Sequence, residues 1–207
     1  MKPYHKIQTV YKRDPSTKFK TLLDGEYSLP EFEYLAECEW VFTEKVDGTN
    51  IRIWNLDSDP IFHGRTDKAQ IPPMLQKSLE DTFCPVAGHD SMANLTLYGE
   101  GYGEKIQNGG KYTGGNKFVL FDVSSAAHSI WLERYNVEKI AASLGIEVAP
   151  IIRTGTLNDM IHDAYCGIQS TWGDFMAEGY VARPKTELRT RNGDRVITKI
   201  KCKDFPS

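Results

Sequence analysis

The sequence predicts a fold of the α+β class, in which antiparallel sheets are flanked by helices. Strand-like and helix-like segments follow one another in a mixed order rather than in regular alternation. Several short β-branched or apolar runs are bounded by Asp-Gly, Asn-Gly or proline, as in antiparallel strands. With 207 residues, of which 40% are hydrophobic and 26% charged, the chain has the composition of a globular protein and can bury one sizeable core. We therefore predict a single domain over residues 1–207.

The first predicted elements are two strands over residues 40–43 and 50–55, which are rich in β-branched and aromatic residues. They flank the turn signal Asp47-Gly48, which favours a hairpin. Residues 60–65 predict a further short strand. Two prolines then open a segment that predicts a helix over residues 72–83.

The middle of the chain predicts two strands, over residues 95–99 and 118–123. The second is a continuous apolar run, FVLFDV, which is typical of a buried strand. The clearest helix spans residues 130–144, and Gly145 ends it. Four of its side chains can share one face: Leu132, Tyr135, Ile140 and Leu144.

The last third predicts a shorter helix over residues 157–165 and a strand over residues 179–183. Two further strands follow, joined by Asn192-Gly193, which is among the strongest short hairpin signals.

Charge is distributed unevenly along the chain. The net charge is −3, which argues against a protein that grips nucleic acid with its whole surface. Residues 183–203, however, hold eight cations and two anions, an excess of six, so the remainder of the chain carries about −9. A basic segment on an acidic body suggests a phosphate-rich partner, although exposed strand edges also carry lysine for solubility.

The N-terminal residues are basic but lack the apolar run of a signal peptide, and no segment approaches the roughly 20 apolar residues that cross a bilayer. We expect no membrane partner and a cytoplasmic location, in the host cytoplasm if the source is viral. The four cysteines form no CxxC pair, so neither a zinc site nor a disulfide framework is indicated: Cys38, Cys84, Cys166 and Cys202.

Six short polar segments stand at strand ends or beside glycine. They are KVDGTN (45–50), HGR (63–65), YGE (98–100), FD (121–122), EGYV (178–181) and KIKCK (199–203). In this order and at these separations, they resemble the six signature motifs of covalent nucleotidyltransferases, which include ATP-dependent DNA ligases, RNA ligases and mRNA capping enzymes. Any single segment is a weak signal, whereas six in order are a strong one.

Finer features resemble the RNA ligase branch that is typified by phage enzymes sealing nicks in duplex RNA and by RNA-editing ligases. These features are Asn50 in KxDGxN, YGEGYGEKIQNGGKY after Leu97, AEGYVARP and the closing IKCKDF. The resemblance implies a nucleotidyltransferase (ATP-grasp-like ligase) domain. We expect no OB-fold domain, because the sequence stops four residues after Lys203.

The resemblance implies that Lys45 is the nucleophile, which attacks the α-phosphorus of ATP and forms lysyl-AMP. Free lysine is protonated at neutral pH, so the reaction needs nearby cations that favour the neutral amine. Lys201 and Lys203, together with magnesium, or manganese in its place, would supply them. Lys199 is the alternative to either, because lysines 199, 201 and 203 alternate onto one face of a strand.

Acidic residues in a pocket for ATP are explained mainly by metal or ribose binding. The resemblance therefore implies that Asp47, Glu100 and Glu178 hold the metal directly or through water, with Glu178 also catalytic and Glu100 also close to the ribose. Asp47 would orient water or the ribose beside Lys45.

The remaining matches concern the nucleotide itself. Arg65 would contact the ribose or the end phosphate, and Phe121 would stack on adenine. Glu44 is a candidate for the purine edge by position only. Asn50 would organise the 5′-phosphate strand or the metal. Phe121 also fits a plain core residue, since it lies within an apolar run.

The implied activity is an ATP-dependent RNA ligase that joins 3′-hydroxyl and 5′-phosphate ends, for example in RNA repair. Its partner is RNA, as a nicked duplex or as processed ends, with a separate nucleic-acid-binding protein or domain as a further candidate. Two alternatives stay open: a minimal ATP-dependent DNA ligase, and a nucleotide- or nucleic-acid-binding module that has lost ligation.

Overall fold

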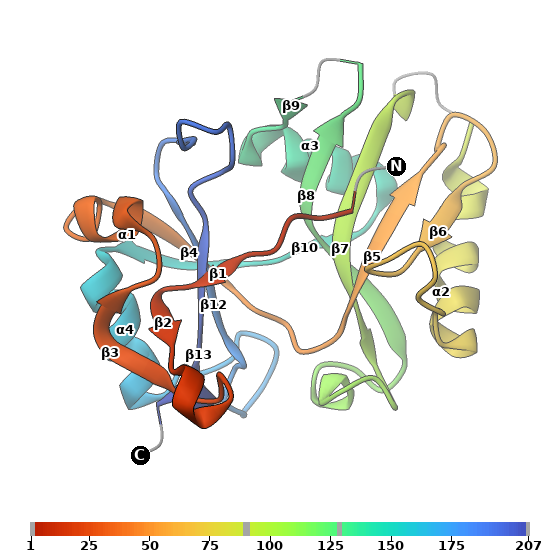
Figure 1. Cartoon of the computed structure of the whole chain (residues 1–207). Coiled ribbons are helices and arrows are strands. Elements are labelled where there is room, and N and C mark those ends of the chain that lie inside the picture. Colours follow the sequence, from red (N-terminus) through yellow and green to blue (C-terminus); the bar gives the residue numbers. More distant parts are fainter. Residues whose placement is uncertain (1–2, 89–91, 128–129, 206–207) are drawn as a thin grey trace. The chain divides into compact units, whose positions relative to one another are not determined.

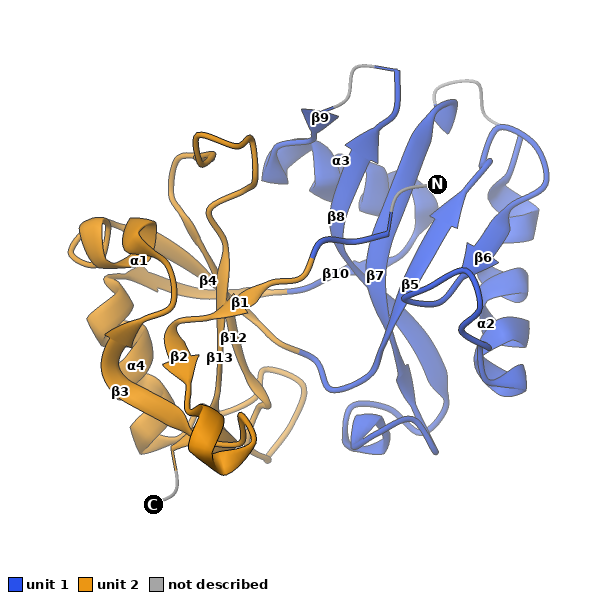
Figure 2. Ribbon diagram, in the orientation of Figure 1, with its two compact units in different colours: residues 1–5, 46–149 blue, residues 6–45, 150–207 orange. Residues whose placement is uncertain are grey.

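The computed structural model describes residues 3–88, 92–127 and 130–205. Their contacts divide the chain into two compact units (Figure 2). Unit 1 comprises residues 1–5 and 46–149, and unit 2 comprises residues 6–45 and 150–207. The chain passes between the units after His5, Lys45 and Ala149. No helix in the described ranges has the length and apolar character to cross a membrane.

Unit 2 is built on a five-stranded sheet whose strand order is β1-β13-β12-β4-β11 (Figure 1). The strands are β1 (Gln8–Thr9), β4 (Trp40–Glu44), β11 (Ile151–Gly155), β12 (Gly179–Pro184) and β13 (Thr198–Lys201). All neighbours are antiparallel except β1 and β13. A two-stranded sheet is formed by β2 (Tyr11–Arg13) and β3 (Leu22–Tyr27), with η1 (Pro15–Thr17) between them.

Helices α1 (Pro30–Tyr34) and α4 (Leu157–Cys166) lie on one side of this sheet (Figure 1). Helix α4 begins with a capping box, in which Thr156 and Asp159 satisfy each other's backbone N–H groups. Its buried side chains recur at helical spacing: Leu157, Met160, Ile161 and Ala164. They join the core that strands β4, β12 and β13 bury through Trp40, Phe42, Tyr180, Ala182 and Ile200.

Unit 1 is built on a second sheet of order β10-β8-β7-β5-β6, with β9 paired to β8 (Figure 1). Its strands are β5 (Thr49–Trp54), β6 (Ile61–His63), β7 (Leu95–Gly103), β8 (Asn116–Ser125), β9 (Ile130–Trp131) and β10 (Glu147–Val148). Helices α2 (Pro73–Phe83) and α3 (Arg134–Leu144) pack on it, and the short helices η2 (Cys84–Val86) and η4 (Gly109–Lys111) lie in its loops.

Side chains of β5 alternate between the two faces of this sheet, as the pleat requires. Ile51 and Ile53 enter the core with Leu75 and Leu79 of α2. The opposite face of β5 therefore carries the polar and aromatic side chains: Asn50, Arg52 and Trp54.

The α+β class with mainly antiparallel sheets is confirmed. The hairpin predicted around Asp47-Gly48 is wrong, because β4 and β5 belong to different sheets. A two-residue hairpin turn of the I′ type needs positive φ at both central residues, and neither Asp47 nor Gly48 has it. Gly48 instead approaches β7 closely: a Cβ atom on it would lie 2.3 Å from the carbonyl oxygen of Gly101.

The helix predicted over residues 130–144 is shorter than expected, because residues 130–131 form β9 and the helix starts at Arg134. Its buried face is Val137, Ala141 and Leu144, whereas Tyr135 is exposed. The strands expected on both sides of Asn192-Gly193 reduce to one bridge between Arg189 and Arg195, since β13 pairs with β12 and β1 instead.

Candidate active site

The clearest cluster of predicted site residues lies in unit 2. The Lys45 ammonium contacts Oε2 of Glu178 at 2.5 Å, and Lys201 forms an ion pair with the other carboxylate oxygen, Oε1. The Glu178 side chain is only 9% exposed, and the two lysine side chains are 21% and 22% exposed. One carboxylate thus bridges two half-buried cations, which leaves the cluster with a formal charge of +1.

Three neighbouring strands place these residues together. Lys45 follows β4, and its backbone N–H donates to the carbonyl of Gly179, the first residue of β12, at 2.9 Å. Gly179 lies opposite Lys201 of β13. The backbone N–H of Cys202 donates to the carbonyl of Glu178 at 3.0 Å, which fixes the residue before the strand.

Gly179 is required for this arrangement. Its φ is +156°, and a Cβ atom there would lie 2.0 Å from the carbonyl oxygen of Ile200 and 2.8 Å from Cα of Lys201. No side chain can occupy that space without moving β13 away. The glycine in EGYV therefore brings Glu178 and Lys201 to contact distance.

Glu44, the candidate for the purine edge, is buried, and both of its carboxylate oxygens already accept hydrogen bonds within unit 2. Its Oε1 accepts from the Ser170 hydroxyl at 2.6 Å, and its Oε2 accepts from the backbone N–H and the hydroxyl of Thr171, both at 2.9 Å. Its backbone N–H donates to Pro150 at 3.0 Å. The carboxylate therefore holds the segment that leads to Glu178, an anchoring role that position in the sequence does not reveal.

The lysines near the C-terminus do not share one strand face as predicted. Strand β13 ends at Lys201, so only Lys199 and Lys201 alternate onto the same face. Lys203 lies in the short helix η5 (Cys202–Asp204) and is exposed. The expectation of a strand continuing through Lys203 is wrong, and the ion pair with Glu178 singles out Lys201.

Unit 1 carries the other predicted residues. Asn50 lies opposite Glu100 on the adjacent strands β5 and β7. The Oδ1 atom of Asn50 is buried and has no hydrogen-bond partner among the described residues. Asp47 accepts a hydrogen bond from the Asn108 side chain at 2.6 Å. This arrangement leaves a buried acceptor beside a carboxylate on the sheet face that points away from the core helices.

Phe121 occupies an irregularity of β8. Tyr98 of β7 pairs with Asp122 and the next residue, Gly99, pairs with Leu120, so Phe121 is the extra residue of a β-bulge. Bulges often re-aim a side chain beside a functional site. Phe121 is half-buried, and its ring meets that of Tyr4 edge to face at 5.0 Å. The Tyr4 hydroxyl donates to Asp122 at 2.5 Å, so Phe121 is not the plain core residue that its apolar neighbours favour.

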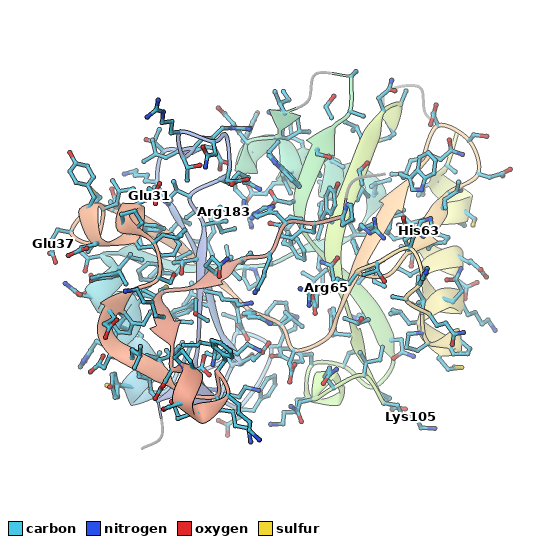
Figure 3. All side chains as sticks on the ribbon, viewed as in Figure 1. Glu31, Glu37, His63, Arg65, Lys105 and Arg183 are labelled. Atoms are coloured by element: carbon cyan, nitrogen blue, oxygen red, sulfur yellow. The ribbon has the colours of Figure 1, made fainter. Side chains whose placement is uncertain are left out.

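Arg65 is exposed and lies in the segment that follows β6 (Figure 3). The adjoining Arg52 on β5 is fully buried and binds both the Gly64 carbonyl and the Asp67 carboxylate. This hydrogen bond with Arg52 lowers the pKa of Asp67. No motif points to Arg52, since an arginine at alternate spacing in a strand resembles a solvated one.

Burial also acts on one tyrosine in each unit, Tyr180 in unit 2 and Tyr98 in unit 1. It raises the pKa of Tyr180 to about 12, aided by the charge of Asp163, and it raises the pKa of Tyr98. Both phenols therefore stay neutral hydrogen-bonding groups at physiological pH.

A metal site made by protein alone is absent from the described ranges, where no three His, Cys, Asp or Glu side chains gather as ligands.

The positive charge of the basic segment 183–203 is partly neutralised by ion pairs. Lys185 pairs with Glu39 at 2.8 Å, and the buried Arg195 pairs with Glu187. Arg189 and Arg191 are exposed cations of this segment.

Comparisons with known proteins identify the family and the fold of this chain. The family model described as RNA ligase matches residues 38–201. Among solved structures, a mutant of the RNA ligase of Naegleria gruberi with ATP and Mn superposes with a TM-score of 0.70 at 17% identity, over 97% of this chain and 56% of that one. An apo mutant gives 0.67 at 18% identity, over 96% and 57%. The same enzyme with PPi gives 0.65 at 18% identity, over 97% and 57%.

The chain thus spans a little under three fifths of the length of these enzymes. At this low sequence identity, the structural likeness shows a shared fold. The search of curated proteins found no match.

Proposed function

The chain belongs to the RNA ligase family, and we propose that it is an ATP-dependent RNA ligase that joins 3′-hydroxyl and 5′-phosphate ends. The observation that carries this proposal is the cluster of Lys45, Glu178 and Lys201 at the end of three adjacent strands. A nucleophilic lysine needs a nearby proton acceptor and a cation beside the phosphate that it attacks. The cluster provides one of each.

In the first step, Nζ of Lys45 bonds to the α-phosphorus of ATP, and the bond from phosphorus to the pyrophosphate oxygen breaks. The Lys45 ammonium first gives up a proton to Glu178, whose Oε2 lies 2.5 Å from Nζ. Lys201 donates to a non-bridging phosphate oxygen as charge develops there. The products are lysyl-AMP and pyrophosphate.

In the second step, an oxygen of the RNA 5′-phosphate attacks the same phosphorus, and the bond to Lys45 breaks. In the third step, the 3′-hydroxyl attacks the adenylylated 5′-phosphate, the phosphodiester forms, and AMP leaves. Every step is an in-line displacement at phosphorus, in which positioning and charge stabilisation supply most of the catalysis. One cationic cluster can therefore serve all three.

The residues proposed to hold the nucleotide lie in unit 1. Phe121 stacks on adenine, a role that its bulged position supports. Arg65 binds the ribose or the end phosphate. Asn50 and Glu100, neighbours across β5 and β7, take the ribose or the 5′-phosphate strand.

The acidic residues suit magnesium or manganese as the companion of ATP. Magnesium commonly takes one or two carboxylates together with substrate phosphates and water, rather than an all-protein cage. The resemblance gives this role to carboxylates in each unit, Asp47 and Glu100 in unit 1 and Glu178 in unit 2. The bound ion would offset the negative charge of the triphosphate.

The test measures self-adenylylation. The protein is incubated with α-labelled ATP and magnesium, and a labelled, acid-labile adduct is expected for the native chain and absent for Lys45→Ala. Lys12→Ala is the matched control, because Lys12 also pairs with a glutamate in unit 2, at 3.2 Å from Glu26. The proposal fails if the native chain never labels or if Lys45→Ala labels equally.

Sealing is assayed on nicked RNA, nicked DNA and single strands. Joining of RNA supports the proposal, and a strict preference for nicked DNA makes the chain a minimal DNA ligase. Binding of ATP without covalent labelling identifies a nucleotide-binding module instead.

A further inference from the structure

We propose that Arg52 and Asp67 form a clamp that positions Arg65 for the nucleotide. The clamp rests on the proposed function, because there Arg65 contacts the ribose or the end phosphate. Arg52 and Asp67 are positioning residues, since they act through the segment that carries Arg65.

The clamp consists of two hydrogen bonds that the Arg52 side chain donates. Nε of Arg52 donates to the carbonyl oxygen of Gly64 at 2.8 Å, and Nη2 donates to Oδ1 of Asp67 at 2.8 Å. These acceptors lie one residue before and two residues after Arg65. Because the guanidinium is planar, two bonds made at once fix both the distance and the orientation of the segment.

Arg52 occupies a place where an arginine is costly. It lies in β5 between Tyr98 of β7 and His63 of β6, and its side chain is 0% exposed. A buried guanidinium loses its hydrogen bonds to water, and bonds to protein groups must offset the free energy that this loss costs. Its third nitrogen, Nη1, is buried without a partner among the described residues. An apolar residue would avoid this cost, so the bonds to Gly64 and Asp67 are the reason for an arginine here.

The clamped segment is compact. The backbone N–H of Ala69 donates to the carbonyl of Thr66 at 3.1 Å. A Cβ atom on Gly64 would lie 2.9 Å from Cβ of Ala69, so the glycine permits this close return of the chain. Arg65 is exposed on this turn.

The guanidinium of Arg65 has no hydrogen bond or ion pair with a protein group in the described part of the chain. Only its backbone can therefore determine where it lies, and that backbone is held by Arg52. A preset Arg65 loses less conformational freedom when it binds a nucleotide. Loss of the clamp should weaken ATP binding, whereas the rate at saturating ATP should change little.

The test uses Asp67, whose side chain is 69% exposed, because its replacement leaves no cavity. Asp67→Ala should raise the ATP concentration for half-maximal self-adenylylation about tenfold. Asp67→Asn keeps an oxygen for Nη2 and should stay within about threefold of the native value. Glu138→Ala is the matched control, because Glu138 also pairs with an arginine in unit 1, at 2.6 Å.

A double-mutant cycle locates the effect. If Asp67 acts through Arg65, Asp67→Ala should add nothing in an Arg65→Ala background. Additive losses in the double variant would overturn the clamp, as would equal effects of Asp67→Ala and Asp67→Asn.

Hydrogen exchange supplies a readout that needs no catalysis. Asp67→Ala should speed amide exchange over residues 64–69 more than Asp67→Asn does, and unchanged exchange contradicts the clamp. If the native chain labels but Asp67→Ala matches it, the clamp falls and the ligase proposal stands. If the native chain never labels, the ligase proposal falls, and the exchange data alone decide whether Arg52 holds the segment.

Discussion

In unit 2 the candidate carboxylates are paired within the unit, whereas in unit 1 several side chains keep a polar atom without a partner among the described residues. Both carboxylate oxygens of Glu178 form ion pairs, one with Lys45 and one with Lys201. Both carboxylate oxygens of Glu44 accept hydrogen bonds from residues 170 and 171. On one face of β5, by contrast, three successive side chains each keep a buried atom unpaired among the described residues: Asn50, Arg52 and Trp54.

The contrast separates two tasks. A cluster in which two lysines share one carboxylate keeps the nucleophile and its charge partners in place before any substrate arrives, because both cations contact the same counter-ion. A face with unpaired acceptors and donors gains more from a polar ligand, because the ligand replaces hydrogen bonds that the protein does not supply. Within the proposed function, unit 2 thus suits the chemistry and unit 1 suits recognition.

The largest effect is expected in unit 2 from Lys201→Ala. Removing a preorganised cation beside the reacting phosphate should slow self-adenylylation by about 10² to 10³. Lys203→Ala should cost clearly less, because Lys203 is exposed in η5 and outside the ion-paired cluster. The rate of labelling at saturating ATP measures both, with Lys12→Ala as the control. Equal losses at both positions would show that the cluster does not single out Lys201.

Gly179→Ala should cause the next largest effect, on stability. The new Cβ would meet the Ile200 carbonyl at 2.0 Å and would impose a strained φ, so we expect a loss of about 3 kcal/mol or more in the free energy of unfolding. Gly193→Ala has positive φ but no atom within 4 Å of its Cβ, and it should cost about 1 kcal/mol. Urea unfolding measures both. Similar losses would mean that close packing of β12 on β13 is not what requires the glycine.

Paired variants of Glu44 and Asn50 test the contrast between the units directly. Glu44→Ala leaves three donors of Ser170 and Thr171 without their acceptor and should cost about 2 kcal/mol of stability. Asn50→Ala removes an acceptor that has no partner among the described residues, so stability should change by no more than about 0.5 kcal/mol. Asn50→Ala should nevertheless lower sealing activity. A strong destabilisation by Asn50→Ala would contradict the division.

The sequence predicted much of this architecture because its signals are local. The apolar spacing of residues 157, 160, 161 and 164 and the capping residues Thr156 and Asp159 specify α4 wherever it packs. The Asp47-Gly48 signal failed because a turn dipeptide reports only its own backbone preference. Whether its flanking strands pair depends on partners far away, here β12 for β4 and β7 for β5.

The residues of the candidate site also differ in whether local sequence signals or distant contacts determine their roles. Lys45, Glu178 and Lys201 were predictable as a set from motifs that resemble those of a known family, and the structure brings the three side chains together. The roles of Glu44 and Arg52 were not, because they depend on contacts with residues 126 and 15 positions away. The bulge at Phe121 could not be predicted from the sequence either, because it arises from the register between β7 and β8.

The smallest expected effect is a pH dependence in unit 2 that comes from Asp159. Hydrogen bonds from the backbone N–H and the hydroxyl of Thr156 lower the pKa of this carboxyl below its value in the unfolded chain. The stabilisation is therefore present above about pH 4 and is lost as pH falls through the lower pKa of the folded state. For an exposed cap we expect about 0.5 kcal/mol at neutral pH. Unfolding by urea between pH 3 and pH 7 should show a smaller pH slope for Asp159→Asn than for the native chain, and an identical slope would mean that the cap does not depend on charge.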